Sequence, residues 1–199
     1  MDIPSFRPTA EGHDSQVGIN YLGHLYLTQL LLPLVKVAPK ARIVMTASSA
    51  HYGTSKVNYP GITSAKAYDH IDNYCVSKLA TVMYVQHLAR SLSKTHPHIT
   101  VNCLHPGACY TNLFKHSWTL YILTTIGFQC LLRSPARGAR TLVYLSLSEE
   151  VDGITGEYWF DERIRQRNPA SNDVQRQREL MQYSCKAVGL VEDDGDASK

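Results

Sequence analysis

Apolar residues recur along this chain at two different periods, which divide it into helices and strands. Residues 14–37 carry apolar side chains at helical spacing, and Pro33 and Pro39 are expected to weaken and then end that helix. A short apolar run predicts a buried strand over 41–47. The remaining predicted elements are helices over 69–93, 134–148 and about 171–189, and strands over 98–104 and 154–160.

Strands that alternate with helices in this way are typical of the α/β class, with a parallel sheet between helical layers. The segment 51–66 is broken by Gly53, Pro60 and Gly61, so we expect a surface loop there. Ligands of such sheets bind beyond the carboxyl ends of the strands. This directs attention to Ser48 and Ser49 after one strand, and to the turn 105–107 after the next.

The composition of the chain agrees with the predicted fold and argues against two functional classes, nucleic-acid binding and metal binding. The 199 residues are 44% hydrophobic, which is enough for one domain over 1–191 followed by an acidic, disordered tail over 192–199. A net charge of +3, without a block of like charge, gives no support for nucleic-acid binding. Five scattered cysteines without a C-x-x-C pair fit a reduced compartment and predict no metal site.

Chemistry enters with Tyr74 and Lys78, which lie four residues apart and therefore on one face of the predicted helix 69–93. A nearby ammonium group favours the phenolate, which would bring the pKa of the tyrosine toward the working range of a general acid or base. Such a pair arises by chance about half a time in a chain of this composition, so its neighbours decide its meaning. A serine at the end of a strand could donate a hydrogen bond to a substrate oxygen.

Together these motifs resemble the short-chain dehydrogenase/reductase family, and most of all its retinol dehydrogenase group. The resemblance spans 1–189 and rests on GINYLGH at 18–24, RIV at 42–44 leading into SSAH at 48–51, YCVSK at 74–78, HPG at 105–107, and Thr111. It implies a partial Rossmann-like fold of three layers with a parallel sheet. It also implies an oxidoreductase in which a nicotinamide cofactor carries the hydride.

The resemblance assigns a role to each matching residue. Tyr74 would exchange a proton with the substrate oxygen, Ser49 would hold that oxygen, Lys78 would lower the pKa of the tyrosine and bind the ribose of the cofactor, and Asn20 would position a water beside the lysine. Ser49 is chosen over Ser48 because 25 residues separate it from Tyr74, an interval typical of the retinol dehydrogenase group with its expanded loop; Ser48 stays the alternative.

Three further residues match the part of the family pattern that contacts the cofactor. Pro106 and Gly107 match the turn beside the nicotinamide, and Thr111 matches the hydroxyl residue beyond that turn. The family pattern favours NADP, with NAD left open, because the discriminating residue belongs to a segment that this sequence does not contain.

The substrate prediction rests on an uncharged stretch over 117–132, which is too short to cross a bilayer. It matches the substrate lid of the family, and its aromatic residues suit a small lipophilic alcohol or carbonyl, but it also suits a core or membrane-surface helix. We expect a cytoplasmic location, and we leave association with the endoplasmic reticulum membrane open. Homo-oligomers and pairing with a full-length relative are also left open.

The sequence departs from the family in lacking the glycine-rich turn G-x-x-x-G-x-G that cradles the cofactor pyrophosphate. We therefore expect this sequence to be a truncated part of an enzyme, in which the strand at 41–47 lies at an unpaired edge of the sheet. The alternative is a short product without cofactor that acts as an interaction module with a full-length relative.

Overall fold

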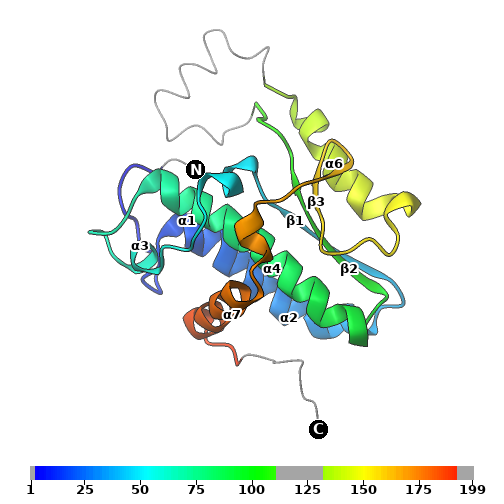
Figure 1. Cartoon of the computed structure of the whole chain (residues 1–199), viewed down its shortest axis with the longest axis horizontal. Coiled ribbons are helices and arrows are strands. Elements are labelled where there is room, and N and C mark those ends of the chain that lie inside the picture. The colour runs from blue at the N-terminus through cyan, green and yellow to red at the C-terminus, as the bar shows by residue number, and fades with distance from the viewer. Residues whose placement is uncertain (1–2, 111–131, 192–199) are drawn as a thin grey trace.

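The computed structural model describes residues 3–110 and 132–191 (Figure 1). The predictions for Thr111, for nearly all of the stretch 117–132 and for the tail from Glu192 therefore lie outside the described residues.

A mainly parallel sheet forms the centre of the fold and confirms the predicted α/β class. Its strands follow the order β1-β2-β3-β4, where β1 is Ala41–Thr46, β2 is Ile99–His105, β3 is Tyr158–Phe160 and β4 is Arg163–Arg165. β1, β2 and β3 run parallel, and β4 runs antiparallel to β3. Among the described strands β1 pairs with β2 alone, as expected for an edge strand.

β3 and β4 differ from the prediction of one strand over 154–160. β3 covers only its last three residues, and the chain then reverses through Asp161 and Glu162, whose φ angles are 52° and 58°. Two successive residues in the left-handed region are typical of the tight turn that joins antiparallel strands. The turn is hard to predict from the sequence because asparagine and glycine, its usual residues, are absent.

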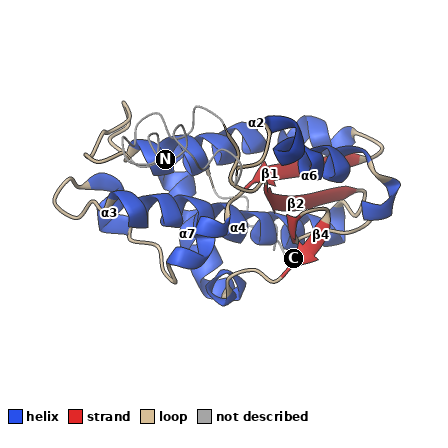
Figure 2. Cartoon of the chain, turned by 90° about the horizontal axis from the view of Figure 1, so that it is seen from above, coloured by secondary structure: helices blue, strands red, loops and turns tan. Residues whose placement is uncertain are grey.

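Helices cover both faces of the sheet, as Figure 1 shows. One face is covered by a continuous helical segment and by the long helix of the fold: α1 (Ser15–Val17), the π-helical turn η1 (Gly18–Leu22), α2 (Gly23–Val37) and α4 (His70–Thr95). The other face is covered by α6 (Pro135–Leu147). α7 (Val174–Val188) packs outside against α4. Figure 2 shows that the strands lie away from α3 (Tyr59–Thr63).

The core follows from the alternation of side chains along β2. Val101 and Cys103 join the large cluster under α4, whereas Leu104 joins Leu145, Val151 and Trp159 on the opposite face. Because successive side chains of a strand point to opposite faces, a strand buried from both sides needs apolar residues at nearly every position. β2 is therefore the central strand of this sheet.

The helix predicted over 14–37 is observed to end at Val37, and it continues through the exposed Pro33. One local expectation needs correction. The predicted loop over 51–66 contains a 3-10 turn, η2 (Ser49–Gly53), as well as α3. The Asn58 side chain accepts the N–H of Gly61 and caps α3, a local contact that can start so short a helix.

Two further 3-10 turns lie within the described residues 132–191. η5 (Glu149–Val151) follows α6, and η6 (Pro169–Asn172) precedes α7.

Candidate active site

Tyr74 and Lys78 lie in the first turns of α4, near the carboxyl end of β1. The Asp69 carboxylate caps this helix by accepting the N–H groups of residues 71 and 72 at 2.9 and 2.8 Å. Lys78 Nζ lies 6.0 Å from the centroid of the Tyr74 ring and donates to the Thr46 carbonyl at 3.1 Å. The helix thus presents a phenol and an amine at the end of the first strand.

Ser48, and not Ser49, faces Tyr74. The Ser48 side chain is near enough to the phenol to lower the pKa of Tyr74, and its hydroxyl oxygen accepts the Ala50 N–H at 3.1 Å. Ser49 is the first residue of η2 and is exposed. A strand directs successive side chains to opposite sides, so a difference of one residue decides which serine points to the helix. The interval to Tyr74, used to choose Ser49, could not reveal this direction.

The ionisation of Tyr74 also differs from the expectation. Burial is the largest effect and raises the pKa of Tyr74 above its usual value, while the hydrogen bond from Ser48 lowers it by less. Lys78 is not among the groups that shift it, because its amine is turned to the Thr46 carbonyl. In this structure Tyr74 is a protonated phenol at neutral pH, not a phenol made acidic by the lysine.

Burial has the opposite effect on Lys78, since desolvation penalises its charged form. It lowers the pKa of Lys78 from 10.5 to about 8. An amine with this pKa gives up and regains a proton close to neutral pH.

Asn20 lies on the other side of Lys78, in the π-helical turn η1. Its amide nitrogen donates to Ser77 Oγ at 3.2 Å, and it lines a cavity of about 300 Å³ together with Thr46 and Lys78. π-helical turns inside α-helices frequently occur at functional sites. The structure therefore brings Asn20 and Lys78 to one cavity, although the asparagine side chain itself binds the neighbouring helix α4.

Pro106 and Gly107 follow β2 directly, at the same edge of the sheet as Ser48. The φ angle of Gly107 is +85°, and a Cβ atom there would lie 2.6 Å from Cδ of Arg133. Only glycine meets both conditions without strain. The Arg133 guanidinium stays over this turn because it pairs with the Asp161 carboxylate through two hydrogen bonds.

The donors at this edge fit the ribose of a nicotinamide cofactor. An ammonium group carries three N–H donors, and among the described residues Thr46 accepts one hydrogen bond from Lys78. The remaining donors can bind a pair of hydroxyl groups next to the Tyr74 phenol. The absence of a side chain at Gly107 makes room for the Arg133 side chain over the turn.

Two polar residues that sequence reasoning missed lie directly behind the site. His51 is buried and contacts the Ser48 carbonyl, and Asn168 binds His51 from η6. A histidine just after the serine pair was the only signal in the sequence. Its partner is 117 residues away, so no local pattern could connect them.

The described residues contain no cluster of side chains suited to a metal ion. Within 3–110 and 132–191, no helix is long and apolar enough to cross a bilayer.

The fold and the site define a Rossmann-like α/β protein with a tyrosine, a lysine and a serine at the carboxyl edge of its sheet. Residues 7–120 match the family model of the short chain dehydrogenases, which is more than half of the chain. The chain therefore belongs to the short-chain dehydrogenase family.

Relatives of known name point to one branch of that family. Human retinol dehydrogenase 14 is 35% identical over 192 residues, which cover 94% of this chain and 55% of the relative. Human polyprenol dehydrogenase is 31% identical over 197 residues, which cover 96% of this chain and 59% of the relative. The chain thus spans little more than half the length of these relatives.

A solved structure supports the fold. An uncharacterized protein from Mycobacterium paratuberculosis superposes with a TM-score of 0.71 at 23% sequence identity, over 96% of this chain and 64% of that one.

Proposed function

We propose that this chain carries the catalytic residues of an NADP-dependent oxidoreductase, with NAD left open, that interconverts a small lipophilic alcohol and its carbonyl. The observation that carries the proposal is the meeting of Tyr74, Ser48 and Lys78 at the carboxyl edge of β1. The family supports a nicotinamide cofactor, and similarity to a retinol dehydrogenase and a polyprenol dehydrogenase supports a lipid-like substrate.

Tyr74 is the proton donor in this proposal, and Ser48 holds the substrate oxygen. The cofactor, when bound, supplies the hydride to the carbonyl carbon or accepts it from the alcohol. In the direction of reduction the phenolic O–H bond breaks, and its proton forms the O–H bond of the alcohol. The Ser48 hydroxyl donates to the same oxygen while negative charge develops on it. The raised pKa of Tyr74 supports the protonated starting state.

Lys78 has two tasks beside the tyrosine. Its remaining N–H donors hold the ribose hydroxyl groups of the cofactor next to the Tyr74 phenol. With its pKa lowered to about 8, the amine can also pass a proton to Tyr74 from the cavity that it shares with Asn20. Pro106, Gly107 and Thr111 are proposed to border the nicotinamide and its phosphates.

Ser48 is preferred to Ser49 as the proposed substrate-binding hydroxyl. Its effect on the pKa of Tyr74 supports this choice, and Ser49 stays the alternative from the sequence spacing. A cytoplasmic location stays a proposal made from the sequence, whose five cysteines form no C-x-x-C pair. Association with the endoplasmic reticulum surface stays a separate proposal, which fractionation of cell membranes would test.

A second function is favoured by one specific observation. Large apolar side chains on α2 are exposed, including Leu30 at 54%, Leu34 at 69% and Val37 at 81%. Together with the edge of β1 that no strand among the described residues pairs with, they support an interaction module that pairs with a full-length relative. α4 gives less support for such a pairing surface, because most of its residues are buried.

Binding of NADPH to the chain alone and to the longest natural product that contains it distinguishes the oxidoreductase from the interaction module. We expect the 199-residue chain alone to show no rise in Tm with NADPH, because it lacks the glycine-rich turn for the pyrophosphate. A clear rise would contradict the proposed loss of that site. If the longest natural product containing this sequence also shows neither a rise nor turnover, the oxidoreductase proposal fails and the interaction module stands.

Turnover by a Tyr74→Phe variant tests the catalytic proposal in that longest product. We expect reduction of retinal by NADPH to be abolished while cofactor affinity stays nearly unchanged, since only the transferable proton is removed. Tyr26→Phe is the matched control, because Tyr26 is 40% exposed on α2. Retained turnover in the Tyr74 variant would exclude Tyr74 as the proton donor.

A further inference from the structure

His51 is a fully buried histidine, three residues after Ser48 and within η2. Its relative exposure is 0%, and its ring centroid lies 4.0 Å from that of Tyr52 and 4.5 Å from that of Tyr158. Both ring nitrogens nevertheless have polar partners. Nδ1 lies 2.5 Å from the Ser48 carbonyl oxygen, and Nε2 lies 3.2 Å from the backbone nitrogen of Asn168.

These two partners define the protonation of the ring. A carbonyl oxygen can only accept a hydrogen bond, so Nδ1 must carry the proton that is donated to Ser48. A backbone N–H can only donate, so Nε2 must be the unprotonated acceptor for Asn168. Both contacts require the same neutral tautomer, which a different assignment of either proton would break.

The donated hydrogen bond acts on the residue that meets Tyr74. The Ser48 backbone is extended, with φ −162° and ψ 157°, and its hydroxyl oxygen already accepts the Ala50 N–H. With its carbonyl bound to His51, Ser48 is held from both the backbone and the side chain. The remaining O–H of Ser48 is then free to donate at the site.

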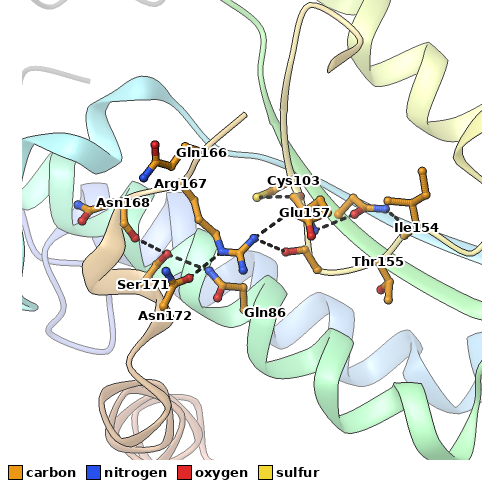
Figure 3. A network of polar contacts seen from close by, with 12 residues as sticks. Gln86, Cys103, Ile154, Thr155, Glu157, Gln166, Arg167, Asn168, Ser171 and Asn172 are labelled. Atoms are coloured by element: carbon orange, nitrogen blue, oxygen red, sulfur yellow. Dashed lines mark hydrogen bonds and ion pairs between the residues drawn. The ribbon is translucent and has the colours of Figure 1, made fainter. Parts of the chain in front are cut away.

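Asn168 links this contact back to the helix that carries Tyr74. Its amide nitrogen donates to the carbonyl oxygens of His51 and Thr54 at 2.7 and 2.8 Å. Figure 3 shows the next links, in which Ser171 Oγ donates to the Asn168 carbonyl at 2.7 Å and accepts from Gln86 of α4 at 2.9 Å. The serine turn and the tyrosine helix are thus joined through one buried polar chain.

We propose that His51 is a positioning residue, which in its Nδ1–H tautomer holds the Ser48 carbonyl and so directs the Ser48 hydroxyl toward Tyr74. The effect of His51 on catalysis rests on the proposed function. The hydrogen bond from His51 to the Ser48 carbonyl does not, and it can be tested without measuring turnover.

Nitrogen NMR on the ¹⁵N-histidine-labelled chain tests the tautomer directly. We expect His51 to show a protonated Nδ1 and an unprotonated Nε2, with the signal assigned by its loss in His51→Asn. A ring that carries its proton on Nε2 would overturn the inference, because it could not donate to Ser48. This result does not depend on cofactor or substrate.

Two substitutions distinguish the hydrogen bond from His51 to Ser48 from the hydrogen bond that His51 accepts from Asn168. In His51→Asn the amide nitrogen can take the place of Nδ1 and donate to Ser48, whereas in His51→Gln the amide oxygen can take the place of Nε2 and accept from Asn168. In the longest natural product that contains this sequence, if positioning of Ser48 matters, His51→Asn should keep kcat within about threefold and His51→Gln should lose about 100-fold, with little change in KM for NADPH. His96→Asn, at the far end of α4, is the control.

Carbon NMR of labelled tyrosines gives the second readout without activity. The Tyr74 phenol, identified with Tyr74→Phe, should titrate at higher pH in His51→Gln than in His51→Asn, since only the former loses the aligned Ser48. If kcat and the Tyr74 titration instead follow the Tm of each variant, His51 is merely structural and the inference is wrong. If the NMR results hold but no variant and no parent turns over, the proposed function fails while the positioning contact stands.

Discussion

Replacing Ser48 and Ser49 one at a time by alanine distinguishes the structural assignment of the substrate-binding hydroxyl from the sequence-based one. The two residues are adjacent and chemically identical, so the pair is its own control. Ser48 contacts the Tyr74 phenol, whereas Ser49 is exposed at the start of η2. We expect activity to depend on the first residue alone.

The magnitude follows from what each hydroxyl does. Removing a donor that stabilises developing charge on a substrate oxygen costs about 100- to 1,000-fold in kcat. Ser48→Ala also removes the cap that accepts the Ala50 N–H at 3.1 Å, which costs about 1 kcal/mol and lowers Tm by about 2 to 4 °C. Ser49→Ala removes neither interaction, so kcat should stay within about twofold and Tm within about 1 °C.

Steady-state reduction of retinal by NADPH, with Tm measured in parallel by circular dichroism, separates the catalytic loss from the loss of the cap. Ser48→Thr keeps both the hydroxyl and a capping oxygen, and it should recover most of the stability. A larger loss of kcat in Ser49→Ala than in Ser48→Ala would refute the assignment. If the loss of kcat in Ser48→Ala is no larger than its fall in Tm accounts for, Ser48 acts only as a cap.

Two further predictions concern stability. Lys78→Met should stabilise the chain by about 1 to 2 kcal/mol at pH 7, because it removes a desolvated amine at the cost of one hydrogen bond to Thr46. Since burial lowers the pKa of Lys78 from 10.5 to about 8, the unfolded chain binds more protons between these values and the parent gains stability as pH rises through them. The free energy of unfolding of Lys78→Met in urea should therefore exceed that of the parent by less at pH 10.5 than at pH 8. A difference that stays constant over this range would contradict the lowered pKa of Lys78. Asp14→Ala should cost about 2 to 3 kcal/mol, because the 0% exposed carboxylate accepts the Val17 N–H at 3.2 Å and the Asn73 amide at 3.1 Å. Asp14→Asn, which keeps an acceptor, should lose less in calorimetry, and equal losses would show that the capping acceptor is unimportant.

Local sequence was sufficient for most elements because each has its own periodic or capping signal. The helix predicted at 69–93 is observed at His70–Thr95, where Asp69 caps a first turn with apolar positions behind it. The predicted strand at 41–47 is observed at Ala41–Thr46. β4 was missed because three exposed residues carry no alternating pattern, and their pairing with β3 depends on the turn before them.

The candidate site was harder to predict, because sequence spacing gives distance along the chain and not direction. The motifs around Tyr74 and Lys78 indicated the correct helix face, but an interval of residues could not tell Ser48 from Ser49. The pKa of Tyr74 also depends on how deeply the ring is buried, which is a property of the packed helix and not of its neighbours in sequence.

By itself the sequence determined the α/β class, the family and the residue types available for proton transfer, because these follow from periodicity and from motifs only a few residues long. Tertiary structure alone decided which serine faces the phenol, where the Lys78 amine points and which tautomer His51 needs. The reason is that hydrogen-bond direction and desolvation arise between segments far apart in the chain, such as the 117 residues from His51 to Asn168.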